Sequence, residues 1–245
     1  MGRKEVEVTS TWSLRLALYN HLINGLESII AEYECESISV VLPEVMQSKG
    51  FSNIVVCYGR CREAPYEGFE INNAVRYGLA EEYMFKHCYD GWSPNELYSR
   101  SLDLFLRNVS SFLRSYSIRT ALEGIEYMLV VLQNGRAVLL EGEKNKVVIP
   151  SVRAVVSAHT HPRNCIPSPQ DIRSLTNILL EGGLGASIVS PNCTLTIFRK
   201  GPFTEDDYLA LASFTRNLRK NTLNELGQLL ARGTLSRNLR IMMHH

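Results

Sequence analysis

The stretch AHTHPRNCIPSPQD, residues 158–171, connects an apolar run to the start of a helix. The apolar run before it, Val152–Ala158, predicts a buried strand. The residues after it predict a helix over 169–181, because the glycine pair at 182–183 suits a left-handed helix end. A strand, a loop and a helix in this order are typical of an α/β domain, and here the strand ends in polar side chains.

The two histidines at the end of this strand predict a metal site. His159 and His161 are two positions apart, so both side chains of an extended strand point to the same side. The next helix begins at Ser168-Pro169 and would return the carboxylate of Asp171 to the strand end. Neutral imidazole and carboxylate are zinc ligands, and three protein ligands leave a fourth position open, as in catalytic zinc sites.

A purely structural interpretation of the same residues is a capping box. Ser168 would be the N-cap, with a proline at the first helical position and Asp171 three residues after the serine. The two interpretations compete for the Asp171 side chain. We favour the metal site, because capping leaves the paired histidines unexplained.

The rest of the second half predicts an α/β (α+β) domain over 92–203. Ser93-Pro-Asn-Glu96 is typical of a helix start, and apolar spacing continues that helix to about 115. Asn134-Gly135 predicts a tight hairpin. The strands that we expect lie at 125–132, 136–142, 146–150, 153–159, 185–190 and 193–199.

The two ends of the chain are less informative. Residues 1–91 predict an α/β region of unknown role, with a helix at 12–34, strands at 37–42 and 53–58, and a helix at 71–87. Residues 204–245 predict a helical, amphipathic extension, helical to about 240. We expect the helices at 12–34 and 204–240 to pack on their own cores; a homodimer or partner surface is the alternative.

Composition excludes several classes of protein. The net charge is +1, with 26 basic and 25 acidic residues, which favours neither nucleic acid nor an anionic membrane as a partner. The sequence shows no signal peptide and no apolar stretch long enough to span a bilayer, so we expect a cytoplasmic protein. Its six cysteines are then expected to be reduced. The alternative for Cys57 and Cys61, with His87-Cys88 downstream, is half of a second zinc site.

His-Thr-His-Pro, a short loop and Pro-Ser-x-x-Asp together resemble the JAMM (MPN+) motif of zinc isopeptidases over residues 92–200. The resemblance implies a curved mixed sheet flanked by helices, a cytidine-deaminase-like fold. It implies Zn²⁺ held by His159, His161 and Asp171, and an oxyanion donor at Ser168. This chain has nine residues between His161 and Asp171 where the family usually has ten, and we expect a tighter turn to absorb the difference.

The resemblance also implies a general base, a glutamate on an earlier strand. Glu126, at the head of the strand YMLVVL, matches best, and Glu123 is the alternative. The implied activity is hydrolysis of peptide or isopeptide bonds in a protein or peptide substrate, with the tail of a ubiquitin-like protein as the candidate. The competing hypothesis is a non-catalytic MPN-type scaffold or adaptor that retains the fold and its metal.

Overall fold

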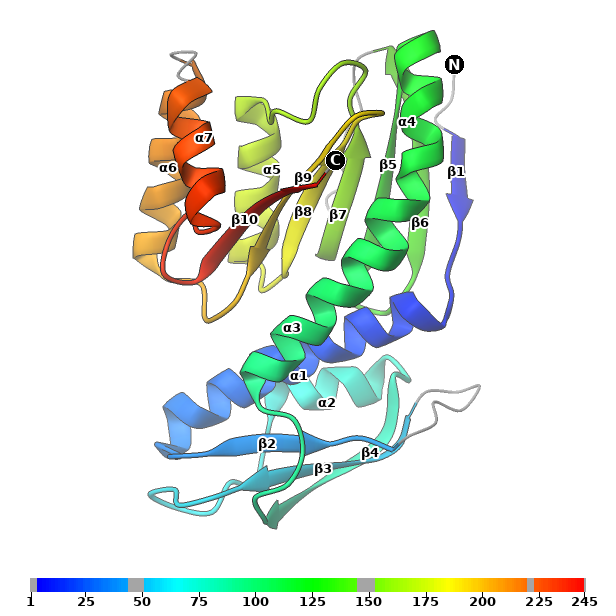
Figure 1. Ribbon diagram of the computed structural model, residues 1–245. Coiled ribbons are helices and arrows are strands. Elements are labelled where there is room, and N and C mark those ends of the chain that lie inside the picture. Colours follow the sequence, from blue (N-terminus) through cyan, green and yellow to red (C-terminus); the bar gives the residue numbers. More distant parts are fainter. Residues whose placement is uncertain (1–3, 44–50, 145–152, 220–222, 245) are drawn as a thin grey trace. The chain divides into compact units, whose positions relative to one another are not determined.

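The computed structural model describes residues 4–43, 51–144, 153–219 and 223–244. Contacts divide the chain into a large unit (Met1–Val8, Leu102–Leu132 and Ala137–His245) and a small unit (Thr9–Ser101 and Gln133–Arg136). Both units combine helices with mixed sheets, which confirms the expected mixed α/β class (Figure 1). No described helix combines the length and the apolar character that a bilayer crossing requires.

The large unit is built on a seven-stranded sheet in the order β1-β6-β5-β7-β8-β9-β10. Its strands are β1 (Lys4–Glu7), β5 (Ile125–Leu132), β6 (Ala137–Lys144), β7 (Ala154–Thr160), β8 (Gly185–Val189), β9 (Thr194–Arg199) and β10 (Leu239–His244). β7 and β8 run parallel, and every other neighbouring pair is antiparallel. β7 is buried along its whole length, so its side chains are covered on both faces of the sheet.

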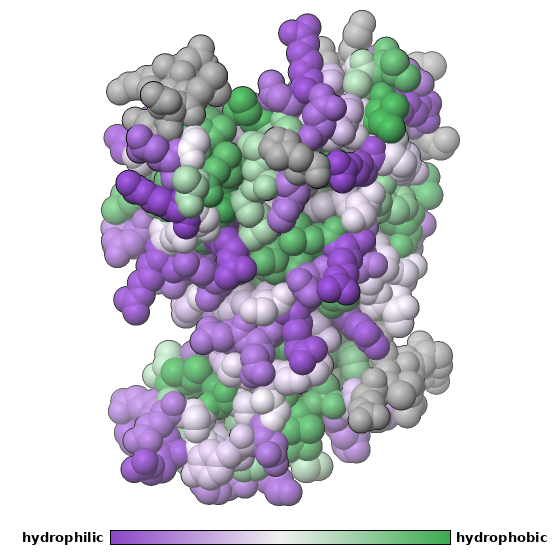
Figure 2. Space-filling view, viewed as in Figure 1, coloured by the Kyte–Doolittle hydropathy of each residue, from purple (hydrophilic) through white to green (hydrophobic). Residues whose placement is uncertain are grey.

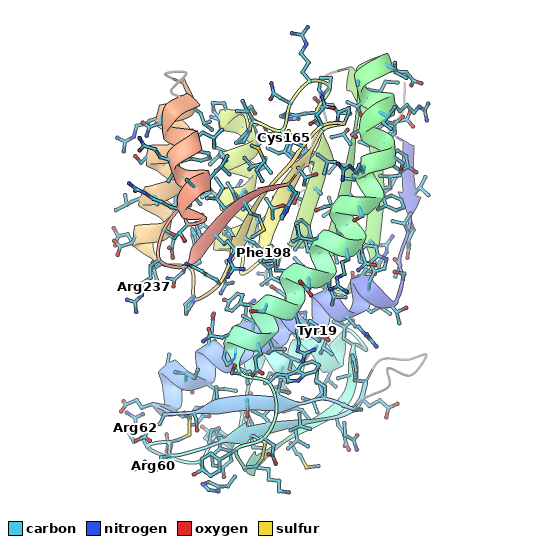
Figure 3. The ribbon with its side chains drawn as sticks, viewed as in Figure 1. Tyr19, Arg60, Arg62, Cys165, Phe198 and Arg237 are labelled. Carbon is cyan, nitrogen blue, oxygen red and sulfur yellow. A yellow bond between two sulfur atoms is a disulfide. The ribbon has the colours of Figure 1, made fainter. Side chains whose placement is uncertain are left out.

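Helices cover the two faces of this sheet. The helices after residue 93 are α3 (Pro94–Leu104), the π-helix η1 (Phe105–Ser110), α4 (Ser111–Glu123), α5 (Pro169–Leu180), α6 (Glu205–Arg219) and α7 (Leu223–Arg232). Most of α3 belongs to the small unit, and the others belong to the large unit. On one face, Phe105 packs against Phe198 of β9, with ring centroids 5.5 Å apart; Phe198 is labelled in Figure 3. On the other face, α5, α6 and α7 share one hydrophobic core with β8, β9 and β10. The sheet is therefore the middle layer of three.

The small unit contains a three-stranded sheet, β2-β3-β4. Its elements are α1 (Thr11–Tyr33), β2 (Ile38–Val41), β3 (Phe51–Tyr58), α2 (Phe69–Arg76) and β4 (Ala80–His87). The helix expected over 71–87 is wrong in its second half. Gly78, with φ of 70°, ends the helical path, and β4 then pairs in parallel with β3.

The C-terminal extension is also not entirely helical. Gly233, with φ of 64°, ends α7, and β10 then pairs with β9 at the edge of the large sheet. The buried Asp207 carboxylate holds the connection in place, because it accepts hydrogen bonds from Ser236 Oγ and from the Asn238 backbone N–H. β1, like β4 and β10, is a strand that the sequence does not predict. The strand expected at 146–150 lies outside the described residues.

All six cysteines form disulfides, which corrects the expectation of reduced thiols. Cys35 bonds Cys61 and Cys57 bonds Cys88 in the small unit, while Cys165 bonds Cys193 in the large unit. The cysteines considered as half of a second zinc site are thus bonded to sulfur. The three disulfides join positions 26 to 31 residues apart, and the spacing of cysteines in the sequence alone does not reveal which ones pair.

Candidate metal centre

The side chains of His159 and His161, at the end of β7, point to one face of the sheet. His159 pairs with Met128 of β5, and the Met128 side chain belongs to a hydrophobic cluster with Ile178 of α5. Residues paired across antiparallel strands share a face, so His159 also points toward α5. His161 follows two residues later, and the Nε2 atoms of the two rings lie 3.1 Å apart. The rings are nearly buried, with 10% and 17% of their side-chain surfaces exposed.

Helix α5 brings the third group to this point. Ser168 is extended, with φ of −80° and ψ of 162°, and Pro169 opens the helix, so Asp171 stands in its first turn. Asp171 Oδ1 lies 3.2 Å from His159 Nε2, and Asp171 Oδ2 lies 3.4 Å from His161 Nε2. The loop with nine residues between His161 and Asp171 therefore reaches far enough to bring the carboxylate to both rings.

These three side chains could hold a metal ion, since one ligand atom from each lies within 4.8 Å of the others. Ligands bonded to zinc at 2.0–2.1 Å in a tetrahedron lie about 3.3 Å apart. The closest separations here, 3.1, 3.2 and 3.4 Å, match that spacing. Two imidazoles and one carboxylate also suit several first-row divalent metals. The donor set and its geometry therefore fit a metal with an open coordination position.

The same carboxylate also caps the helix. The Ser168 backbone N–H donates to Asp171 Oδ2 at 2.6 Å, and the Asp171 N–H donates to Ser168 Oγ at 3.3 Å. One side chain thus combines the capping bond with a position from which it could also hold a metal ion. Oδ1 is directed at His159, while Oδ2 takes the capping hydrogen bond and still lies near His161.

The surroundings shift the pKa values of Asp171 and His161 in opposite directions. Burial alone would raise the pKa of Asp171, but hydrogen bonds from His159 and His161 and the Ser168 N–H outweigh burial and hold that pKa far below 3.8. Burial alone would lower the pKa of His161, but its hydrogen bond with Asp171 and the Asp171 and Glu126 charges raise it above 6.5. The site thus attracts positive charge, a proton or a metal cation, between its carboxylates.

Glu126 lies at the head of β5, the strand beside β7. The Tyr127 N–H donates to Thr160 Oγ1 at 2.8 Å, and continuing the β5–β7 register by alternation puts Glu126 opposite His161. Its carboxyl group interacts electrostatically with His161, His159 and Asp171, so it belongs to the same cluster. Burial raises the pKa of Glu126, the two histidines lower it, and the net shift is upward. A half-buried carboxyl with a raised pKa beside a candidate metal site has the properties that a general base requires.

Ser168 contributes a hydroxyl next to this cluster. Its oxygen accepts the capping hydrogen bond from the Asp171 N–H, so the hydroxyl proton remains available to donate to a substrate oxygen. The side chain is half-buried at the first turn of α5. The alternative base Glu123 instead takes two hydrogen bonds from Arg119 Nε on the exposed side of α4, so the structure gives it no part in the cluster.

The sequence analysis did not predict the disulfide that holds the loop between His161 and Asp171 in place. Cys165 stands between the second histidine and the aspartate, and its disulfide partner Cys193 lies in the turn between β8 and β9 (Figure 3 labels Cys165). The Cys165 N–H also donates to Cys193 Sγ, and the His161 N–H donates to the Val189 carbonyl at 2.8 Å. The loop is therefore tied at its start to β8 and at its middle to the turn that follows β8.

Comparison of the chain with family models, with curated proteins and with solved structures found no match.

Proposed function

We propose that this protein is a zinc-dependent hydrolase that cleaves peptide or isopeptide bonds. The observation that carries the proposal is the convergence of His159, His161 and Asp171 at separations suited to one metal ion. The resemblance of the same residues to the JAMM motif supports the choice of zinc and of an amide substrate.

The positions of the residues support one proposed role for each. Zinc bound by His159, His161 and Asp171 would supply Lewis-acid activation of water and of a carbonyl group. Glu126 would accept the proton of the attacking water and deliver it to the leaving amine, for which a raised pKa is favourable. The Ser168 hydroxyl would donate to the oxygen that becomes negative as the carbonyl is attacked.

The substrate proposed is a protein or peptide, and the tail of a ubiquitin-like protein is the first candidate. The leaving group would be a lysine side-chain amine or a main-chain amine. The three disulfides favour a compartment in which thiols are oxidised over the reducing cytoplasm expected from sequence.

Metal analysis combined with a cleavage assay tests the proposal. The purified protein should contain one zinc ion per chain and should cleave linear or lysine-linked fusions of ubiquitin-like proteins. Glu126→Gln, which keeps the size of the side chain but cannot accept the proton, is the matched inactive control. Bound zinc without turnover on either type of fusion would reject the enzyme and support the scaffold hypothesis.

A further inference from the structure

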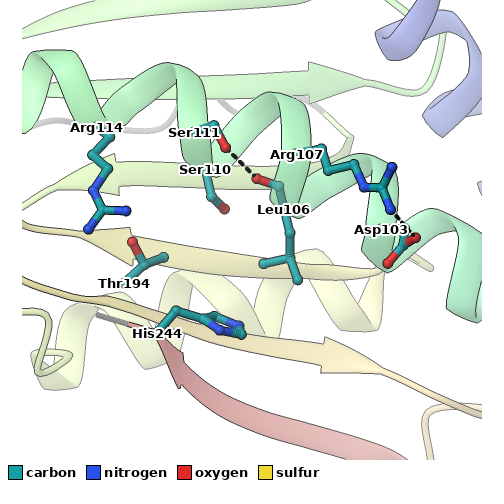
Figure 4. A pocket seen from close by; sticks show the side chains of 8 residues that line it. All are labelled: Asp103, Leu106, Arg107, Ser110, Ser111, Arg114, Thr194 and His244. Atoms are coloured by element: carbon teal, nitrogen blue, oxygen red, sulfur yellow. Dashed lines mark hydrogen bonds and ion pairs between the residues drawn. The ribbon is translucent and has the colours of Figure 1, made fainter.

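The large unit contains a pocket, lined mostly by polar residues, that includes none of the residues of the candidate metal centre. It has a volume of about 340 Å³ and lies between η1 and α4 on one side and the paired ends of β9 and β10 on the other (Figure 4). The Ser110 hydroxyl on its wall donates to Ser187 of β8, so the pocket is on the α4 face of the sheet. His159 pairs with Ile188, the next residue of β8, and points to the opposite face. The pocket is thus separated from the metal centre by the sheet.

One face of a continuous helical segment forms the longer wall. Asp103, Arg107, Ser111 and Arg114 recur at helical spacing along α3, η1 and α4, and all four line the pocket. The segment includes a π-helical turn, a feature found often at functional sites. Within it, Ser111 Oγ donates to the Leu106 carbonyl at 3.0 Å, while the Leu106 side chain supplies an apolar part of the wall (Figure 4).

The charges in the pocket leave one arginine without a counter-ion. Arg107 donates to Asp103 at 3.2 Å, an exposed pair that is neutral overall. Arg114 is exposed and forms no ion pair within the described ranges, and its guanidinium extends toward Thr194 of β9 (Figure 4). The His244 imidazole of β10 lies on the far side of Thr194, with which it is paired in the sheet. The pocket therefore has excess positive charge and hydrogen-bond donors.

We propose that this pocket binds the phosphate group of a small phosphorylated molecule. The donors come from different elements: a guanidinium from α4, a hydroxyl from β9 and an imidazole from β10. A tetrahedral phosphate can accept hydrogen bonds from several directions, whereas a planar carboxylate is satisfied by the two parallel donors of one arginine. The volume is at the lower end of the range for small-molecule sites, about 300–1,000 Å³, and exceeds the need of the anion alone. The organic part would lie against Leu106, which supplies the apolar part of the wall. Figure 2 shows apolar side chains bordered by hydrophilic ones on the face that carries α4 and β10.

Calorimetric titration of the full chain with glycerol phosphate, inorganic phosphate and acetate, at constant ionic strength, tests the proposal. Both phosphates should bind at one site per chain and acetate should not. Arg114→Gln should weaken phosphate binding about tenfold or more, because it removes charged hydrogen bonds. Thr194→Val should weaken it severalfold. The matched control is Arg119→Gln, an exposed arginine of the same helix outside the pocket, and it should bind phosphate like the unaltered chain.

The titration is repeated after chelation, because phosphate can also bind a metal ion. Binding that survives chelation and is weakened by Arg114→Gln supports the pocket, whether or not the protein hydrolyses amides. Binding that disappears with the metal would place the phosphate at the metal centre and overturn the proposal. Absence of saturable binding, equal binding of acetate, or equal losses in Arg114→Gln and Arg119→Gln would also overturn it.

Discussion

Asp171 Oδ1 in the first turn of α5 lies 3.2 Å from Nε2 of His159 in β7, and a loop connects this strand to this helix. The other oxygen of the same carboxylate accepts the Ser168 N–H at 2.6 Å. The hydrogen bond that starts α5 therefore also fixes the orientation of a proposed metal ligand. A partner that orients a metal ligand in this way is a recurrent feature of metal sites.

The first prediction concerns the contribution of the Asp171 carboxylate to metal affinity. Asp171→Asn keeps the size of the side chain and one oxygen, but loses the negative charge. Loss of a group that only orients a ligand costs about 10–100-fold in metal affinity, so loss of the ligand charge should cost more than about 100-fold. Metal content after dialysis measures the effect. Asn177→Asp, on an exposed position of the same helix, should leave metal content unchanged.

The second prediction concerns the base. Glu126→Gln should retain one metal ion per chain and the fold, but lower the rate of amide hydrolysis by about 10²–10⁴-fold, the usual contribution of general acid–base catalysis. Single-turnover cleavage of a fusion substrate is the measurement. Glu123→Gln provides the control, because that residue is paired with Arg119 on α4. Equal activity in Glu126→Gln and the unaltered chain would exclude Glu126 as the base.

The third prediction uses two substitutions of Ser168. Ser168→Ala should lower kcat about 10²–10³-fold by loss of an oxyanion donor, and should lower the free energy of unfolding by about 1 kcal/mol by loss of the N-cap. Ser168→Gly should lower kcat equally but cost only a few tenths of a kcal/mol, because glycine is a good N-cap. If kcat recovers in the glycine variant, the serine acts only through the helix start.

The fourth prediction is a pH dependence with opposite signs for stability and for metal binding. The pKa of His161 is raised in the metal-free folded chain, so its stabilising contribution is full below the unfolded value and is lost as pH rises through the folded value, above 6.5. Metal affinity should rise over that same interval, because the metal binds the neutral ring. Urea unfolding with chelator and metal titration across this range measure the two trends. His161→Gln should abolish both.

Sequence patterns predict well those elements whose boundaries are local. The strand expected at 125–132 is observed at those residues, and the helix expected at 169–181 is observed over Pro169–Leu180. In both places the signal lies within the element and its ends: an apolar run, or a proline and a serine at the start and glycines at the end. The same local information brings His159 and His161 to one face, since alternation along a strand needs no knowledge of the fold.

Elements that depend on a distant partner are not predicted. β4 carries exposed residues on a surface strand, and its pairing with β3 outweighs a helix-like spacing. β10 forms its strand by antiparallel pairing with β9 at the edge of the large sheet. The pairing of Cys165 with Cys193 likewise depends on the turn after β8, which comes beside the metal loop only in the folded sheet.

The last prediction concerns that disulfide. The bond between Cys165 and Cys193 joins positions 28 residues apart and fixes the loop between His161 and Asp171. A native disulfide typically contributes about 2–4 kcal/mol to the free energy of unfolding. Without it, the loop would order only when the metal binds, so part of the binding free energy would be spent on ordering residues 162–168. Changing both cysteines to alanine should therefore weaken metal affinity at least tenfold while β7 and α5 remain folded.

The chain provides a matched control in the bond between Cys57 and Cys88, which joins positions 31 residues apart in the small unit. Changing that pair to alanine should destabilise the protein by a similar free energy, because the two loops have nearly equal lengths. It should leave metal affinity unchanged, since neither sulfur lies in the unit that carries the ligands. Equal losses of metal affinity in both variants would mean that the disulfide acts through general stability. A loss confined to the Cys165 and Cys193 variant would show that the bond acts on the loop that brings Asp171 to the two histidines.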